Sequence, residues 1–290
     1  MGLLWGLIGV FIFSLTLPAT KFTVGYMDPL FVGLGRAVVA GILAVVTLFF
    51  TGSPILPIRL FPRLLVVSLG VVVGFPVFSA YAMQHVPSSH GGVITGILPL
   101  ATAAAGVWIA QESQTVLFWI AGTLGSALVV LYSLWNGKAE LKTGDLFLLL
   151  AVLSAAIGYA EGGRLSKKHG GWKVISWSLV ISLPVSISAS ALTFRVESLQ
   201  APASAWLGFL YTGVFSMFLG FFAWYKGLAM SGIGKVGQIQ LIQPFLTFLF
   251  SALLLSEKID SLTLLAGFFV SGTIFLGRIR SGRKKEEPAK

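Results

Sequence analysis

Residues 92–102 read GVITGILPLAT and residues 237–247 read GQIQLIQPFLT, so glycine, isoleucine, proline and threonine recur at an offset of 145 residues. The match continues without a gap, and the same offset carries Glu112 onto Glu257. Matching leucines and isoleucines mean little in apolar segments. A proline, an acid and several glycines in one register do not arise from composition alone. We therefore predict that the chain is an internal duplication.

The composition excludes a soluble globular protein, because 56% of the 290 residues are hydrophobic and only 10% are charged, with a mean hydropathy of +0.91. Apolar runs of roughly 20 residues, long enough to cross the hydrocarbon core as helices, recur along the whole chain. Pro, Gly and charged clusters separate them. We predict ten transmembrane helices, at residues 3–21, 30–51, 64–83, 91–111, 116–135, 145–163, 174–193, 205–225, 235–255 and 262–279.

The predicted fold is an all-α integral membrane protein with two five-helix repeats, at 3–134 and 145–279, and a basic cytoplasmic tail at 280–290. Five is an odd number, so the second repeat enters the membrane from the opposite side and the repeats are inverted. Most of the 20 Lys and Arg residues fall between or after the spans, on the side that the N-terminus occupies. The positive-inside rule then places both termini in the cytoplasm, with the protein in the inner or plasma membrane.

Inverted repeats are typical of secondary transporters, because two similar halves can open in turn to each side of a site at the midplane. A non-transporting receptor or assembly factor is an alternative, and so is a membrane-embedded enzyme that acts on lipids. The enzyme would need clustered acids, histidines or metal ligands, whereas the chain has ten acids and no cysteine. The G-x-G-x-x-G match at 232–237 links two spans rather than a strand and a helix. We therefore expect no catalysis, cofactor, metal or nucleic acid, with the lipid bilayer and a small-molecule substrate as partners and the monomer as the working unit.

Polar side chains mark one face of the ninth predicted span. Gln240, Gln243, Thr247 and Ser251 follow one another at spacings of three, four and four residues, which places them on the same side of a helix. Polar groups in a span normally face a protein interior or a watery cavity. Thr and Ser can instead bond the carbonyls of their own helix. A long amide needs several partners, so the glutamines are the stronger candidates for substrate binding.

The fourth predicted span carries a matching face with Thr95 and Thr102. The offset places both of them opposite polar positions of the ninth span, so we expect the two faces to meet across a pseudo-twofold axis. Pro99 and Pro244 lack an N–H and leave a carbonyl free one turn earlier, which predicts a kink in each helix. The alternative is that the prolines only shape the packing.

Aromatic side chains end the third and eighth spans, with Tyr81 in the one and Trp224 and Tyr225 in the other. Aromatic residues at span ends commonly form an interfacial belt. The alternative is a wall that stacks organic substrates.

Two charged residues lie within spans. Arg36, inside the second span, is a candidate to bind an anionic substrate group or to pair structurally with a carbonyl or carboxylate. Glu161, in the sixth span, is a candidate for proton or cation coupling, or for a local ion pair with Arg164 at i+3.

Glu112 and Glu257 follow the fourth and ninth spans, where we expect them to accept hydrogen bonds from the N-terminus of the next helix, with gating as the alternative. His85 and His90 lie near an external loop and can titrate.

The sequence also resembles the drug/metabolite transporter superfamily, specifically an EamA-type transporter with two EamA repeats. The resemblance rests on Tyr81-Ala82-Met83, Pro99 and Gln111-Glu112 in the first half and Tyr225, Gly227-Leu228, Pro244, Ser256-Glu257 and Gly267 in the second. It implies ten helices in inverted repeats, a central cavity lined largely by the third, fourth, eighth and ninth helices, and transport without ATP. The expected function is export of small organic metabolites, amino acids or drug-like compounds, by alternating access.

Overall fold

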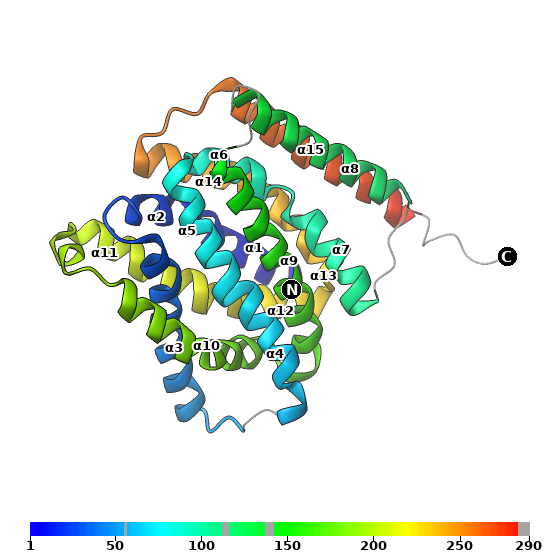
Figure 1. Cartoon of the computed structure of the whole chain (residues 1–290). Helices are drawn as coiled ribbons and strands as arrows, with labels where there is room; N and C mark the ends of the chain where they lie inside the picture. Colours follow the sequence, from blue (N-terminus) through cyan, green and yellow to red (C-terminus); the bar gives the residue numbers. More distant parts are fainter. Residues whose placement is uncertain (55–56, 112–115, 137–141, 284–290) are drawn as a thin grey trace.

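The computed structural model describes residues 1–54, 57–111, 116–136 and 142–283, and the regular secondary structure of these residues is helical throughout (Figure 1). Within this part of the chain, eight helical segments are long and apolar enough to cross a membrane. They are Gly2–Thr23, Pro29–Phe50, Ile58–His85, Ser88–Ala110, Thr143–His169, Gly171–Thr193, Ala203–Ser231 and Ile233–Leu255.

Two further helices occupy the positions of the fifth and tenth predicted spans. They are α8 (Val116–Asn136) and α15 (Ser261–Arg283), which pack against each other along one edge of the bundle (Figure 1). The apolar helices found there among the described residues are shorter, Thr123–Tyr132 and Ser261–Thr273. The chain is thus an all-α membrane protein. Ten crossings in two inverted repeats remain a prediction, as do the boundaries 3–134 and 145–279, and the tail at 280–290 lies mainly outside the described residues.

Three of the eight membrane segments are single helices: α3 (Pro29–Phe50), α9 (Thr143–His169) and α10 (Gly171–Thr193). The other five change helix type or are interrupted. The first consists of α1 (Gly2–Ser14) and α2 (Thr16–Thr23); the third of η1 (Ile58–Leu60), α4 (Phe61–Val67), the π-helix η2 (Ser68–Gly74) and α5 (Phe75–His85); the fourth of α6 (Ser88–Thr95) and α7 (Leu98–Ala110). The seventh segment occupies the position of the eighth predicted span and consists of α11 (Ala203–Leu210), the π-helix η4 (Tyr211–Leu219) and α12 (Gly220–Ser231), preceded by η3 (Val196–Gln200). The last segment occupies the position of the ninth predicted span and consists of α13 (Ile233–Gly237), η5 (Gln238–Ile242) and α14 (Gln243–Leu255). The spans keep the numbers of the ten predicted spans below.

These irregularities recur at the offset found in the sequence. Both π-helices lie in corresponding parts of the third and eighth spans. Ile97 and Ile242 each precede a helix whose first turn contains one of the two prolines related by the offset. In the first turn a missing N–H costs no intrahelical hydrogen bond. Gln111 and Ser256, which end the fourth and ninth spans, are the two non-glycine residues with positive φ in the described chain, at 57° and 52°. The backbone therefore repeats the pattern of the sequence.

The helix pairs are also unchanged when the halves are exchanged. Helix α1 packs on α12 as α9 packs on α5, and α1 contacts α14 as α9 contacts α7. Helix α6 contacts α14 as α13 contacts α7, and the counterparts α3 and α10, and α8 and α15, contact each other. This is the pattern expected of two equivalent halves related by a pseudo-twofold axis, which stays a prediction.

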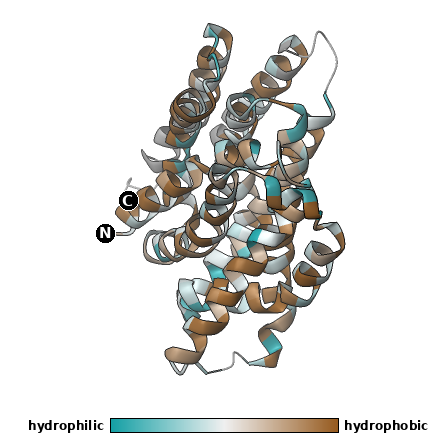
Figure 2. Ribbon diagram, turned by 90° about the vertical axis from the view of Figure 1, so that its left-hand side faces the viewer, coloured by the Kyte–Doolittle hydropathy of each residue, from teal (hydrophilic) through white to brown (hydrophobic). Residues whose placement is uncertain are grey.

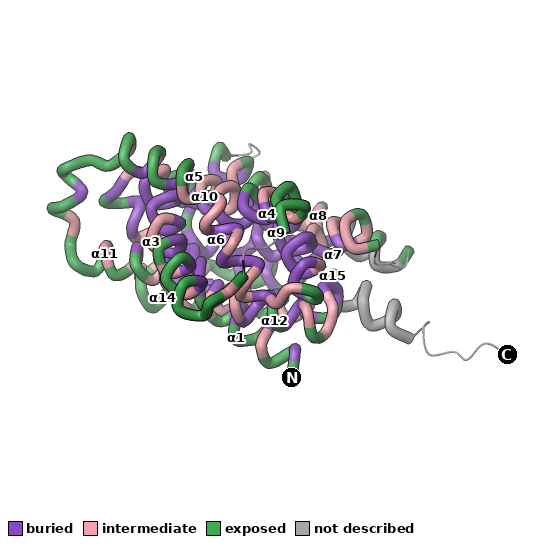
Figure 3. The backbone as a smooth tube through the Cα atoms, turned by 90° about the horizontal axis from the view of Figure 1, so that it is seen from below, coloured by how far each residue is buried: buried purple, intermediate pink, exposed green. Residues whose placement is uncertain are grey.

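Buried residues gather in the middle of the bundle and exposed residues lie around its margin (Figure 3). The exposed helical surfaces are predominantly hydrophobic (Figure 2), and they include large side chains such as Phe49 and Phe50, which are 79% and 80% exposed. A soluble monomer rarely exposes apolar surface on this scale. The outer face is suited to lipid, and buried polar side chains such as Arg36 and Gln240 lie inside.

Candidate functional site

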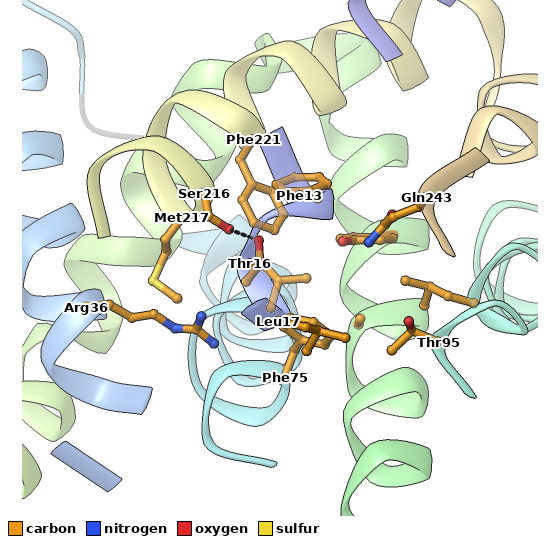
Figure 4. A pocket seen from close by; sticks show the side chains of 14 residues that line it. Phe13, Thr16, Leu17, Arg36, Phe75, Thr95, Ser216, Met217, Phe221 and Gln243 are labelled. Carbon is orange, nitrogen blue, oxygen red and sulfur yellow. Dashed lines mark hydrogen bonds between the residues drawn. The ribbon is translucent and has the colours of Figure 1, made fainter. Parts of the chain in front are cut away.

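A cavity lies within the bundle, lined by residues from both halves of the chain (Figure 4). Its volume is about 20 Å³, which is room for a water molecule rather than an organic metabolite. In this structure the cavity is therefore too small to hold such a metabolite. Its lining residues are Phe13, Thr16, Leu17, Arg36, Val71, Phe75, Thr95, Leu98, Ala155, Tyr159, Ser216, Met217, Phe221 and Gln243.

Interruptions in the helices place the polar lining residues. Thr16 follows the break between α1 and α2, Thr95 ends α6, and Gln243 begins α14. Ser216 lies within the π-helix η4, and its hydroxyl shares a hydrogen bond of 2.8 Å with that of Thr16. Non-helical or broken backbone is tolerated at membrane depth only where protein or a cavity surrounds it. The helix breaks therefore lie where the cavity and its polar residues surround them.

Arg36 enters the cavity from the side opposite Gln243 and Thr95 (Figure 4). It is 1% exposed, and its Nη1 and Nη2 donate to the hydroxyls of Thr20 and Ser79 at 3.5 and 3.3 Å. Its Nε has no hydrogen-bond partner. The ion pairs of the described residues do not include Arg36. A positive charge thus lies deep in the bundle without a carboxylate partner in the part of the chain that the structure describes.

Aromatic rings form another part of the wall. Phe13 lies 5.1 Å from Phe221 between ring centroids, and Tyr159 lies 5.9 Å from Phe221. Trp224 packs behind them, 5.4 Å from Tyr159. The cavity consequently offers one charged group, several neutral hydrogen-bonding groups and an aromatic surface.

The structure separates the predicted polar residues of the fourth and ninth spans. Thr95 and Gln243 line the cavity, and the Oε1 of Gln243 is buried without a partner. Gln240 is 2% exposed and does not line the cavity, yet neither atom of its amide has a partner. Thr102 is buried with an unpartnered hydroxyl, and Thr247 donates to the carbonyl of Ser14 at 3.0 Å.

Helix α6, which ends at Thr95, packs against α14, which carries Gln243 and Thr247, whereas Thr102 lies in α7 and Gln240 in η5. Pro99 and Pro244 are buried in the first turns of α7 and α14. Ser251 shares a hydrogen bond of 2.8 Å with Ser88 at this contact.

The three aromatic candidates lie outside the cavity lining. Tyr81 stacks on Phe147 at 5.4 Å. Trp224 and Tyr225 are fully buried, so neither belongs to an interfacial belt, and the Tyr225 hydroxyl donates to the Gly158 carbonyl at 3.0 Å. Trp224 supports the aromatic wall from behind.

Glu161 forms a local ion pair: Arg164 donates to its Oε1 at 2.8 Å, and Arg63 lies 4.0 Å away. The Nη1 of Arg164 also donates to the Ile109 carbonyl at 2.8 Å. Glu161 is therefore joined to the end of the fourth span, apart from the cavity.

Glu257 accepts hydrogen bonds from the first turn of α6, not from the next helix, whose N-terminal Thr263 N–H is accepted by Asp260 at 2.7 Å. Its counterpart Glu112 lies outside the described residues. His90 is buried and lies 2.6 Å from the Oδ1 of Asp145, whereas the ring of His85 stacks on Phe147 at a distance of 6.4 Å between centroids.

Sequence reasoning missed several lining residues, above all Thr16, Ser216 and Tyr159. The first span contained a usable signal, since Thr16, Thr20 and Thr23 recur at spacings of four and three residues and form a polar face. Among the described residues, His, Asp and Glu side chains form no group of three that could hold a metal ion.

These features define a multi-pass helical membrane protein with a polar and aromatic cavity inside the bundle. A model of the EamA-like transporter family matches residues 1–134 and 142–277. The chain is 44% identical over 255 residues to uncharacterized transporter YdeK of Bacillus subtilis (strain 168), with 88% of each chain covered. It is 25% identical over 256 residues to uncharacterized transporter YyaM of the same organism, covering 84% of this chain and 83% of the relative.

A crystal structure of a protein resembles the fold with a TM-score of 0.70 at 15% identity, covering 96% of this chain and 98% of the other. That likeness concerns the fold alone. The family match and the YdeK relative show that the chain belongs to the EamA-like transporter family. The predicted drug/metabolite transporter membership is confirmed, and the protein is a membrane transporter.

Proposed function

We propose that the protein is a secondary transporter that exports small organic metabolites, amino acids or drug-like compounds, across the inner membrane by alternating access. The observation that carries the proposal is the cavity itself, where polar groups at helix breaks from both halves meet an aromatic wall. Such a mixture of convergent polar groups and apolar surface is typical of a small-molecule site. No enzymatic step is part of the proposal.

The small size of the cavity fits a stage of the cycle in which no substrate is held. Two equivalent halves can separate at either end of the bundle, and each separation would connect the cavity to one side of the membrane. We expect the fourth and ninth spans to move, because the helix of each is interrupted near the cavity. Both termini are placed in the cytoplasm in this proposal, on the charge distribution of the connecting segments.

Flux measurements in proteoliposomes test the proposal. The purified protein would be screened with amino acids, nucleosides and cationic drugs, with and without a pH gradient, so that coupling to protons is tested together with substrate choice. We expect saturable flux of at least one class. Gln243→Leu should reduce this flux, since it removes an amide from the cavity. The matched control is Gln200→Leu, which should not reduce the flux because Gln200 is exposed in η3. Folded protein without flux for any class, or flux that ignores Gln243, would contradict the proposal.

A further inference from the structure

Resting on the proposed transport function, we infer that the cavity selects a small organic carboxylate, with the guanidinium of Arg36 as the group that binds its negative charge. Arg36 is the only charged side chain among the described residues that line the cavity. It is the eighth residue of the 22-residue helix α3. An Arg near the end of a helix can extend its side chain to the membrane interface, but Arg36 lies too deep for this. The charge therefore stays inside the bundle.

An unpaired charge in this position is costly. Charged residues within membrane segments normally pair with one another or face a pathway, and buried charges in general are paired or bound to an ion. Arg36 has no carboxylate partner among the described residues. The side chain is 1% exposed and its Nε is unpartnered. A structural role alone leaves this cost without compensation, whereas an anionic ligand would supply the missing charge.

The geometry of the guanidinium supports the same conclusion. Its contacts with Thr20 and Ser79, at 3.5 and 3.3 Å, are longer than the roughly 2.7–2.9 Å typical of charge-assisted hydrogen bonds. Both partners are neutral hydroxyls. They orient the group without neutralising it. Arginine carries five N–H donors in a fork that matches the two oxygens of a carboxylate, so donors remain for a ligand.

The rest of the cavity defines what is attached to the carboxylate. Phe13, Tyr159 and Phe221 offer an aromatic surface for an apolar body. The unpartnered Oε1 of Gln243 offers one neutral acceptor on the opposite side (Figure 4). The described lining contains no Asp or Glu, so an organic cation would meet a like charge and no counter-charge. Discrimination against cations follows from this repulsion.

Ligand-dependent thermal shifts of the full-length protein in detergent provide a test that does not depend on flux. The probes are hydrocinnamate, its amide and the phenylpropylammonium ion, which share a skeleton and differ in charge. We expect the wild type to bind the carboxylate about tenfold or more tightly than either of the others, as expected for a hydrogen-bonded charged group. Arg36→Gln should abolish this preference, and Arg36→Lys should retain part of it.

Arg195→Gln is the matched control, because Arg195 is 72% exposed beside Asp28 and lies outside the cavity; it should behave as the wild type. Equal or tighter binding of the ammonium ion, or a carboxylate preference that survives in Arg36→Gln, would overturn the inference. If Arg36→Gln does not fold, the affinities of the three probes for the wild type and for Arg36→Lys still test the inference. Gln243-dependent flux of a cation would refute the carboxylate while leaving transport intact, and absence of flux for every class would refute transport itself.

Discussion

Glu257 Oε1 accepts two hydrogen bonds from Ser88, one from its backbone N–H at 2.9 Å and one from its hydroxyl at 2.8 Å. Its Oε2 accepts the N–H of Ser89 at 3.0 Å. These residues begin the fourth span, whereas Glu257 follows the ninth. One carboxylate therefore satisfies the free N–H groups at the start of a helix in the other half, where negative charge is also favoured by the helix dipole.

This contact predicts a pH-dependent stability. Burial raises the pKa of Glu257, but hydrogen bonds from the backbone and hydroxyl groups of Ser89 and Ser88 outweigh it and hold the pKa below the ordinary value of 4.5. A carboxyl group with a lowered pKa stabilises the fold above its unfolded pKa, and this contribution disappears as the pH falls through the folded pKa. We expect Glu257→Gln to lower Tm at neutral pH and to have little effect near pH 3.

Thermal unfolding in detergent between pH 7 and pH 3 measures this difference. Glu197→Gln is the control, because Glu197 is exposed in η3. Its Tm should follow the wild type across the range. Parallel Tm curves for Glu257→Gln and the wild type, with no convergence in acid, would show that the contact does not stabilise the protein.

The two glutamines of the ninth span should respond differently to leucine. The amide of Gln240 is buried with no partner for either atom, so Gln240→Leu should raise stability by about 1–3 kcal/mol, the cost of an unsatisfied buried polar group. It should still reduce transport, because Gln240 corresponds to the cavity residue Thr95 under the offset. Tm and proteoliposome flux, measured together, check this combination. A loss of stability without a loss of flux would assign Gln240 to the fold instead.

Close contact between η2 and α9 makes Gly70 sensitive to a single added methyl group. A Cβ at Gly70 would lie 2.6 Å from the carbonyl oxygen of Ser154 and 2.9 Å from the Cα of Gly158, and backbone atoms cannot rotate away. We expect Gly70→Ala to cost about 1–3 kcal/mol. At Gly237 a Cβ has no neighbour within 4 Å, so Gly237→Ala should be neutral. The two variants are compared by the midpoints of their thermal aggregation. Equal midpoints would contradict the close contact between η2 and α9.

Two residues of the candidate site were predicted from the duplicated stretch of the sequence. Thr95 and Gln243 lie in the copied stretch, and both line the cavity beside the predicted helix breaks. Arg36 was identifiable because a charge inside a span is costly. The pairing of these residues across the bundle could not be predicted, since it depends on how far apart the helices pack.

Other lining residues needed the tertiary structure. Thr16 and Ser216 share a hydrogen bond between spans that lie 200 residues apart in the chain, and the offset does not relate them. Tyr225 ends the predicted eighth span, but the helix continues to Ser231 and Tyr225 is fully buried, with its hydroxyl donating to the Gly158 carbonyl. Residue type and position in a span do not separate these two environments.

Accessibility of introduced thiols tests alternating access through the cavity most directly. The chain contains no cysteine, so Thr95→Cys or Ser216→Cys provides a single thiol in the lining, and Thr51→Cys provides an exposed thiol at the end of α3. The thiols are labelled with a membrane-impermeant reagent in vesicles of both orientations. The cavity thiols should react from either side and should be protected by substrate. The Thr51→Cys thiol should react from one side alone. Cavity thiols that react from the same single side under every condition, while transport continues, would contradict the account.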